Sequence, residues 1–242
     1  MPIHRILTLL PSKKLEKSDN YKVESYLADD FTKTLKGYDL VVLHQLPSLT
    51  NKISKILEEI KKNETPVMFI LGAQTNYNAF NSLNAGLSVS PGKSLQNEAL
   101  AVINSNFPLF TINEETKLFA GDLPPLNAAF GTYKITNSAN VLFYQKIGSV
   151  ATKQPLILFN QQGNSRSCVI TGDGIWRWKL ADYMQHQSHD IFNELLGKFV
   201  QYLAVSEDRS FFRVKGENNY YENESIEFSA ELYNDSYELI NT

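Results

Sequence analysis

The feature that most constrains this chain is a set of short, almost wholly apolar runs separated by one amphipathic segment. The runs lie at residues 3–10, 38–44 and 66–71. Runs of this length, bounded by proline or polar residues, are typical of strands buried on both faces. Between the last two runs, residues 51–63 repeat isoleucine and leucine at spacings of three and four, which predicts a helix with one apolar face. Buried strands joined by such a helix predict a parallel sheet with crossover helices.

The middle of the chain has a different pattern. Residues 88–110 carry glycine, proline and polar residues, and the apolar segments 141–147, 155–159 and 167–171 follow as three closely spaced strands. This succession predicts a β-rich insertion, a meander joined to the parallel core. Residues 191–204 return to helical spacing, with large apolar side chains on one side.

The last part of the chain alternates apolar and polar residues over 225–233, and this period of two indicates a half-buried antiparallel strand. We therefore predict a main domain over residues 1–206 and, over 207–242, the truncated start of a β-sandwich module. Two or three strands are marginal alone, so this segment should pack on the main domain or be partly disordered. The expected fold class is α/β: a flavodoxin-like parallel sheet with crossover helices, a β-rich insertion and a short C-terminal β segment.

Composition narrows the function. The 242 residues carry a net charge of −3, so nucleic-acid binding has no electrostatic support. The single cysteine, Cys168, lies in an apolar run where a strand would bury it, and no spacing of Cys and His suggests zinc. No apolar run approaches the roughly 20 residues that a membrane span needs. We expect no cofactor.

The order strand, strand, helix, strand, sharp turn resembles the class I glutamine amidotransferase-like fold. That family closes its third core strand with a Gly-x-Cys-x-Gly turn, which presents a nucleophilic cysteine at the start of a helix. The corresponding turn, residues 72–76, reads Gly-Ala-Gln-Thr-Asn. Gly72 matches the first glycine, Gln74 stands in the place of the cysteine, and Asn76 replaces the second glycine. The resemblance implies an amidotransferase-like domain over residues 1–206 that lacks its nucleophile.

Three further segments resemble large bacterial, Bacteroidetes-type membrane proteins that join an amidotransferase-like domain to membrane helices. They are residues 38–47, 172–180 and 231–234. This resemblance implies that membrane-spanning segments lie outside the present chain and that this part is extracytoplasmic. It also implies that the partners are another protein or other domains of the same polypeptide, with no nucleic acid among them.

The candidate site lies where the predicted parallel strands end, because open parallel sheets bind ligands beyond the carboxyl ends of their strands. That edge gathers residues 11–12, 44–45, 72–76 and 172–176. His44 and Asp173 are the candidate acid–base pair; the alternative is that His44 caps the end of its strand by bonding to backbone. Gln74 is a candidate donor to a ligand carbonyl. Alternatively, Gln74 and Asn76 bond the open amides of the following helix.

Residues 176–178, Trp-Arg-Trp, form the densest aromatic cluster. In an extended segment Trp176 and Trp178 share one side and offer a stacking platform to a sugar or peptide, with Arg177 binding a carboxylate. The structural alternative is that the flanking glycines permit a sharp turn under which both indoles pack, with Asp173 capping the turn.

His186, His189 and Asp190 lie close together in the sequence and are residue types that bind metals. Their polar neighbours indicate a solvated loop instead, and we assign no metal.

Three functions stay open. The first is a non-catalytic interaction or scaffold module. The second is a hydrolase using His44 and Asp173, and the third is a carbohydrate-binding module using the two tryptophans. The missing nucleophile favours the first.

Overall fold

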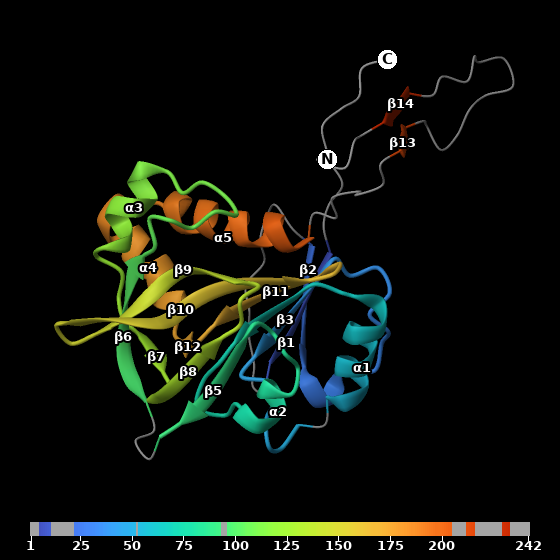
Figure 1. Cartoon of the computed structure of the whole chain (residues 1–242), viewed down its shortest axis with the longest axis horizontal. Coiled ribbons are helices and arrows are strands. Elements are labelled where there is room, and N and C mark those ends of the chain that lie inside the picture. The colour runs from blue at the N-terminus through green and yellow to red at the C-terminus, as the bar shows by residue number, and fades with distance from the viewer. Residues whose placement is uncertain are drawn as a thin grey trace, which may run out of the picture. The chain divides into compact units, whose positions relative to one another are not determined.

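The computed structural model describes residues 5–10, 22–51, 53–92, 96–204, 212–215 and 229–232 (Figure 1). The chain divides into two compact units, residues 1–205 and 206–242. In the second unit, β13 (Phe212–Lys215) pairs antiparallel with β14 (Ser229–Leu232). The short C-terminal β segment is therefore confirmed, whereas its identity as the start of a β-sandwich stays a prediction.

Half of the ten-stranded sheet in the first unit is parallel. Its strands are β1 (Arg5–Leu10), β2 (Lys22–Leu27), β3 (Leu40–His44), β4 (Val67–Ile70) and β11 (Ser165–Ile170). They lie in the order β2-β1-β3-β4-β11, and each neighbouring pair is parallel. This is the 2-1-3-4-5 order of flavodoxin-like sheets, which confirms the predicted fold class. The fifth place is filled by β11, which contains most of the segment 167–171 predicted as the last strand of the insertion. That assignment is wrong, because β11 pairs parallel with β4 and so belongs to the parallel core.

The insertion extends the same sheet with antiparallel strands. These are β6 (Asn97–Ile103), β7 (Leu126–Ala128), β9 (Ala139–Ile147) and β10 (Val150–Gln162). The two-residue β12 (Gly172–Asp173), which follows β11 in the chain, adds one more antiparallel strand. Their order is β12-β7-β6-β9-β10, and β10 pairs antiparallel with β11. A separate hairpin joins β5 (Leu87–Pro91) to β8 (Gly131–Ile135). Strand β11 is thus the seam, with an antiparallel neighbour on one side and a parallel neighbour on the other.

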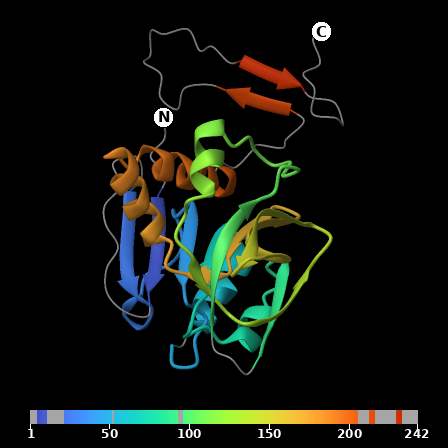
Figure 2. The same cartoon turned by 90° about the vertical axis from the view of Figure 1, so that its left-hand side faces the viewer.

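Helices cover both faces of the sheet (Figures 1 and 2). They are the single-turn η1 (Ala28–Asp30), α1 (Ser54–Asn63), α2 (Tyr77–Asn81), α3 (Glu114–Ala120), α4 (Trp176–His186) and α5 (Asp190–Ala204). Helices α1 and α2 contribute to the core on one face, and α3, α4 and α5 to the core on the other. Among the residues described, no helix is both long and apolar enough to cross a bilayer.

The continuous apolar runs are explained by cores on both sides. In β4, Met68 and Ile70 belong to the cluster under α3, α4 and α5, while Val67 and Phe69 belong to the cluster under α1 and α2. Each such side chain contributes about 1.5–3 kcal/mol when it is fully buried. Cys168 of β11 is fully buried in the first cluster, and this burial raises the pKa of its thiol well above the ordinary value.

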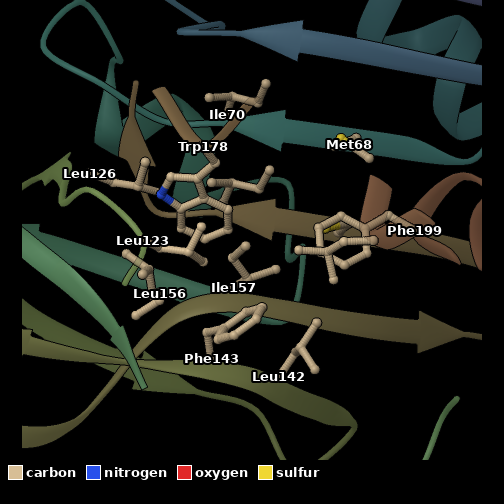
Figure 3. Packing of buried hydrophobic residues seen from close by; sticks show 14 of the residues in the cluster. Met68, Ile70, Leu123, Leu126, Leu142, Phe143, Leu156, Ile157, Trp178 and Phe199 are labelled. Carbon is tan, nitrogen blue, oxygen red and sulfur yellow. The ribbon is translucent and has the colours of Figure 1, made fainter. Parts of the chain in front are cut away.

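Trp178 is the largest fully buried side chain of the core under α3, α4 and α5 (Figure 3). Its indole lies beside Leu123 and Leu126 and meets the ring of Phe143 edge to face, with the ring centroids 5.8 Å apart. Its Nε1 donates a hydrogen bond of 2.8 Å to the carbonyl of Pro124. Because the one polar atom of the ring is satisfied, the indole is buried without an unpaired donor.

Candidate functional site

The carboxyl edge of the parallel strands brings the predicted acid–base pair together. His44 is the last residue of β3, and Asp173 lies in β12, directly after β11. Their side chains meet with His44 Nε2 2.9 Å from Asp173 Oδ1. The contact brings the predicted pair together, while an acid–base role for it stays a prediction. Residues 11 and 12, expected at the same edge, lie outside the described residues.

Asp173 binds three polar groups at the carboxyl edge of the parallel strands. Its Oδ1 contacts His44 Nε2 and accepts the backbone N–H of Gly174 at 2.8 Å, and its Oδ2 accepts the side-chain amide of Gln45 at 3.0 Å. The hydrogen bond from His44, helped by the Gly174 amide and the nearby Arg177 guanidinium, lowers the pKa of Asp173 below its ordinary value although burial opposes this. The carboxylate therefore stays ionised at neutral pH and holds the imidazole in a fixed orientation.

Gln45 links Asp173 to the turn after β4. It is a non-glycine residue with a φ of 53°, a left-handed conformation that costs roughly 1–2 kcal/mol. Its Nε2 bonds Asp173, and its Oε1 accepts the backbone N–H of Gln74 at 2.9 Å. A Cβ at position 72 would lie 2.7 Å from the Cδ of Gln45, so a larger residue there would displace the Gln45 side chain. Sequence reasoning placed Gln45 at this edge but missed its role, because a left-handed backbone leaves no signal in the residue type.

The turn of residues 72–76 closes on itself. The backbone N–H of Gly72 donates to Thr75 Oγ1 at 3.0 Å, and Thr75 N–H donates to the Gly72 carbonyl at 3.1 Å. Thr75 is buried, so this hydroxyl is part of the turn. Asn76 Oδ1 accepts the Ala79 N–H and caps α2, which is the structural role foreseen for it. Gln74 has an exposed side chain at the turn, and a ligand-binding role for Gln74 or Asn76 stays a prediction.

The two tryptophans do not form a platform. Residues 176–178 begin α4 instead of an extended segment, and residues two apart on a helix point about 200° apart. Trp176 is 61% exposed, whereas Trp178 is fully buried. The prediction of paired indoles is therefore wrong, and the alternative in which both pack under the turn holds for Trp178 alone. Arg177 lies over the Trp176 ring at 5.9 Å, and a Cβ at position 174 would collide with its guanidinium.

The histidines at and after the end of α4 make other contacts. His186 Nδ1 lies 2.9 Å from Asp182 Oδ1, and His189 Nδ1 lies 3.1 Å from the Lys179 carbonyl oxygen. Asp190, the third residue considered with them, begins α5. Within the described ranges, no three His, Cys, Asp or Glu side chains are grouped so that they could hold a metal ion.

The fold and its edge define a flavodoxin-like α/β protein with a hydrogen-bonded polar cluster beyond β3, β4 and β11. The sequence matches no family model, and no curated protein matches it. Among solved structures it is similar to a cytoplasmic protein of Salmonella typhimurium LT2. The TM-score is 0.50 and the identity 14%, over 80% of this chain and 98% of that chain. At this identity the likeness establishes the fold alone.

Two other similar structures score lower. A protein of Thermoplasma acidophilum assigned as a GMP synthase subunit has a TM-score of 0.47 and 15% identity, over 84% of this chain and 96% of that chain. Alpha-L-fucosidase isoenzyme 2 of Paenibacillus thiaminolyticus has a TM-score of 0.48 and 9% identity, over 88% of this chain and 34% of that chain. At these scores neither structure assigns a family to this chain, and the amidotransferase-like character and the Bacteroidetes-type membrane context stay predictions.

Proposed function

We propose that this chain is a catalytically inert, amidotransferase-like module that binds another protein or another domain of its own polypeptide. The observation that carries the proposal is that the polar groups at the carboxyl edge bind one another. Asp173 holds three donors, and Gln45 joins it to the turn of residues 72–76. This network fastens the ends of β3, β4 and β11 together, which is a structural task.

The residues of the turn support the same proposal. In the resembling family this turn presents a nucleophile, whereas Gln74 has an amide, which cannot attack a substrate. The hydroxyl of Thr75 is buried and accepts the Gly72 amide. The larger, membrane-anchored bacterial polypeptide is part of the proposal on the sequence resemblance alone.

An activity screen with edge variants tests this proposal. The assays measure ammonia release from glutamine and hydrolysis of nitrophenyl esters and glycosides. They compare the wild type with His44→Ala and with His189→Ala, a control that removes an imidazole elsewhere. We expect all three proteins to give the same background rates. His44→Ala should be less stable because it breaks the Asp173 network, and His189→Ala should lose only its single contact with the Lys179 carbonyl. A wild-type rate that His44→Ala alone lowers about a hundredfold or more would show general acid–base catalysis and overturn the proposal.

A hydrolase is the second candidate, and one observation favours it. His44 and Asp173 are 2.9 Å apart with side chains 26% and 32% exposed, so a carboxylate orients an imidazole that solvent can reach. In this mechanism His44 takes a proton from water, and Asp173 stabilises the resulting imidazolium. The same screen separates the candidates. Hydrolysis that Asp173→Asn and His44→Ala both abolish, with His189→Ala active, would establish the hydrolase.

A further inference from the structure

Helix α4 carries an apolar stripe on its outer face. Trp176, Leu180, Tyr183 and Met184 are 61%, 50%, 48% and 78% exposed. Their spacing places them within an arc of about 100° on one side of the helix. The other exposed large apolar side chains among the described residues are scattered over separate segments: Leu49, Leu118, Phe130, Ile135 and Val150. Isolated apolar residues are ordinary on a surface, whereas a contiguous set marks an interaction site.

The opposite face of α4 fixes the stripe in place. Trp178 and Asp182 are fully buried, and the Asp182 carboxylate accepts the backbone N–H of Phe192 at 2.9 Å and contacts His186 Nδ1. The stripe therefore lies on a helix held by the core and by a buried hydrogen bond to α5. A rigid, preformed surface loses little conformational entropy when a partner binds.

The charged residues beside the stripe indicate the chemistry of the partner. On a helical projection Arg177 borders one side of the stripe, and Lys179 and His186 border the other. The single carboxylate of α4, Asp182, is buried on the opposite face. In a second copy laid against this face, either alignment of the two helices would bring these basic residues together, which is unfavourable. A partner with carboxylates beside its apolar residues is complementary.

We propose that the α4 stripe, formed by Trp176, Leu180, Tyr183 and Met184, binds an acidic amphipathic segment of a protein partner. This proposal rests on the proposed function, because it names the surface by which the module binds. The stripe spans about 12 Å, which matches about two turns of a partner helix lying along α4. Trp, Tyr, Met and Arg are also residue types enriched at protein interfaces.

Two synthetic peptides with the full chain test the proposal. Both are amphipathic helices with the same leucines, and the positions beside the leucines are Glu in one and Lys in the other. By fluorescence anisotropy, we expect the Glu peptide to bind the wild type at least about tenfold more tightly than the Lys peptide. Met184→Asp should weaken the Glu peptide by at least about tenfold. Leu118→Asp, on α3 and also 78% exposed, should leave its affinity unchanged. Equal binding of both peptides, or equal binding by both variants, overturns the proposal.

Two further measurements separate other occupants of the stripe. If sedimentation shows a dimer that Met184→Asp dissociates, the occupant is a second copy of this chain. If vesicles of phosphatidylcholine and phosphatidylserine bind the wild type and not Met184→Asp, the occupant is a lipid surface. Either result overturns the acidic-segment proposal. If the protein has an activity that depends on His44 and still binds the Glu peptide, the proposed function alone is overturned. If it has no such activity and does not bind the Glu peptide, this inference alone is overturned.

Discussion

At the scale of single residues, Gln45 shows how the carboxyl edge is held. Its left-handed backbone costs stability, and the two hydrogen bonds of its side chain offset that cost at about 0.5–1.5 kcal/mol each. Gly72 leaves the space that the Gln45 side chain fills. Packing against the Gln45 side chain therefore explains the glycine at the start of the turn of residues 72–76.

Replacing Asp173 by asparagine should lower the free energy of unfolding by about 1–3 kcal/mol at neutral pH, because three donors lose a charged acceptor. The pKa of Asp173 is lowered in the folded state, chiefly by the hydrogen bond from His44. A depressed folded pKa contributes stability above the unfolded value of about 3.9, and this contribution is lost as the pH falls through the folded pKa.

The pH dependence of this variant is measured by urea unfolding. The difference in unfolding free energy between wild type and Asp173→Asn should be large above about pH 5 and shrink below about pH 4. Asp122→Asn, at an exposed position of the loop after α3, is the control and should change little. A difference between wild type and Asp173→Asn that persists undiminished at about pH 3 would mean that the charge of Asp173 is not what stabilises the edge.

At the scale of elements, α3 and α4 are the two helices that the sequence analysis missed, and α4 is the one that borders the candidate site. Gly172 and Gly174 favoured an extended segment, and the polar residues before Asp190 favoured a loop. The spacing of Trp176, Leu180 and Tyr183 is helical, but these side chains face outward, so the helix has no conventional buried stripe. The contact between His44 and Asp173 was predictable, because the ends of parallel strands meet at one edge of the sheet.

The corner between α4 and α5 depends on Asp182. Asp182→Ala should lower the free energy of unfolding by about 2–3 kcal/mol, because it leaves the buried N–H of Phe192 without an acceptor. His186→Ala should cost at most about 1 kcal/mol, since His186 is 38% exposed at the side chain and the carboxylate keeps its backbone donor. Chemical unfolding of both variants checks this order, and equal losses would contradict it.

At the scale of the whole molecule, β1, β3 and β4 of the parallel half were predictable, whereas β11 was assigned to the insertion and the antiparallel half was predictable only as β-rich. The apolar runs that became β1, β3 and β4 are local signals with neighbours close in sequence. The pairing of β12 with β7 and of β6 with β9 joins distant segments, and its register is set by contacts that no single run encodes. The sequence patterns therefore predict that strands follow Val141, but they do not predict the order of these strands in a continuous sheet.

The first unit should fold without the second. Both core clusters are made of residues between Leu7 and Ala204, so removal of residues 206–242 takes away no described core side chain. We expect the fragment 1–205 to unfold cooperatively, with a thermal midpoint within about 4 °C of that of the full chain. Calorimetry measures this, and a loss of cooperativity or a fall of about 10 °C or more would show that the C-terminal segment belongs to the main fold.

The position of β11 as the seam of the sheet has a consequence for biosynthesis. Strand β4 leaves the ribosome with one open edge, and its partner on that side begins only at Ser165. At about 5–20 residues per second, the nascent chain waits roughly 5 to 20 seconds between Ile70 and that strand. An unpaired apolar strand edge is a template for aggregation. We therefore expect the open edge of β4 to be the part of the newborn chain most in need of chaperone shielding or temporary pairing until β11 is made.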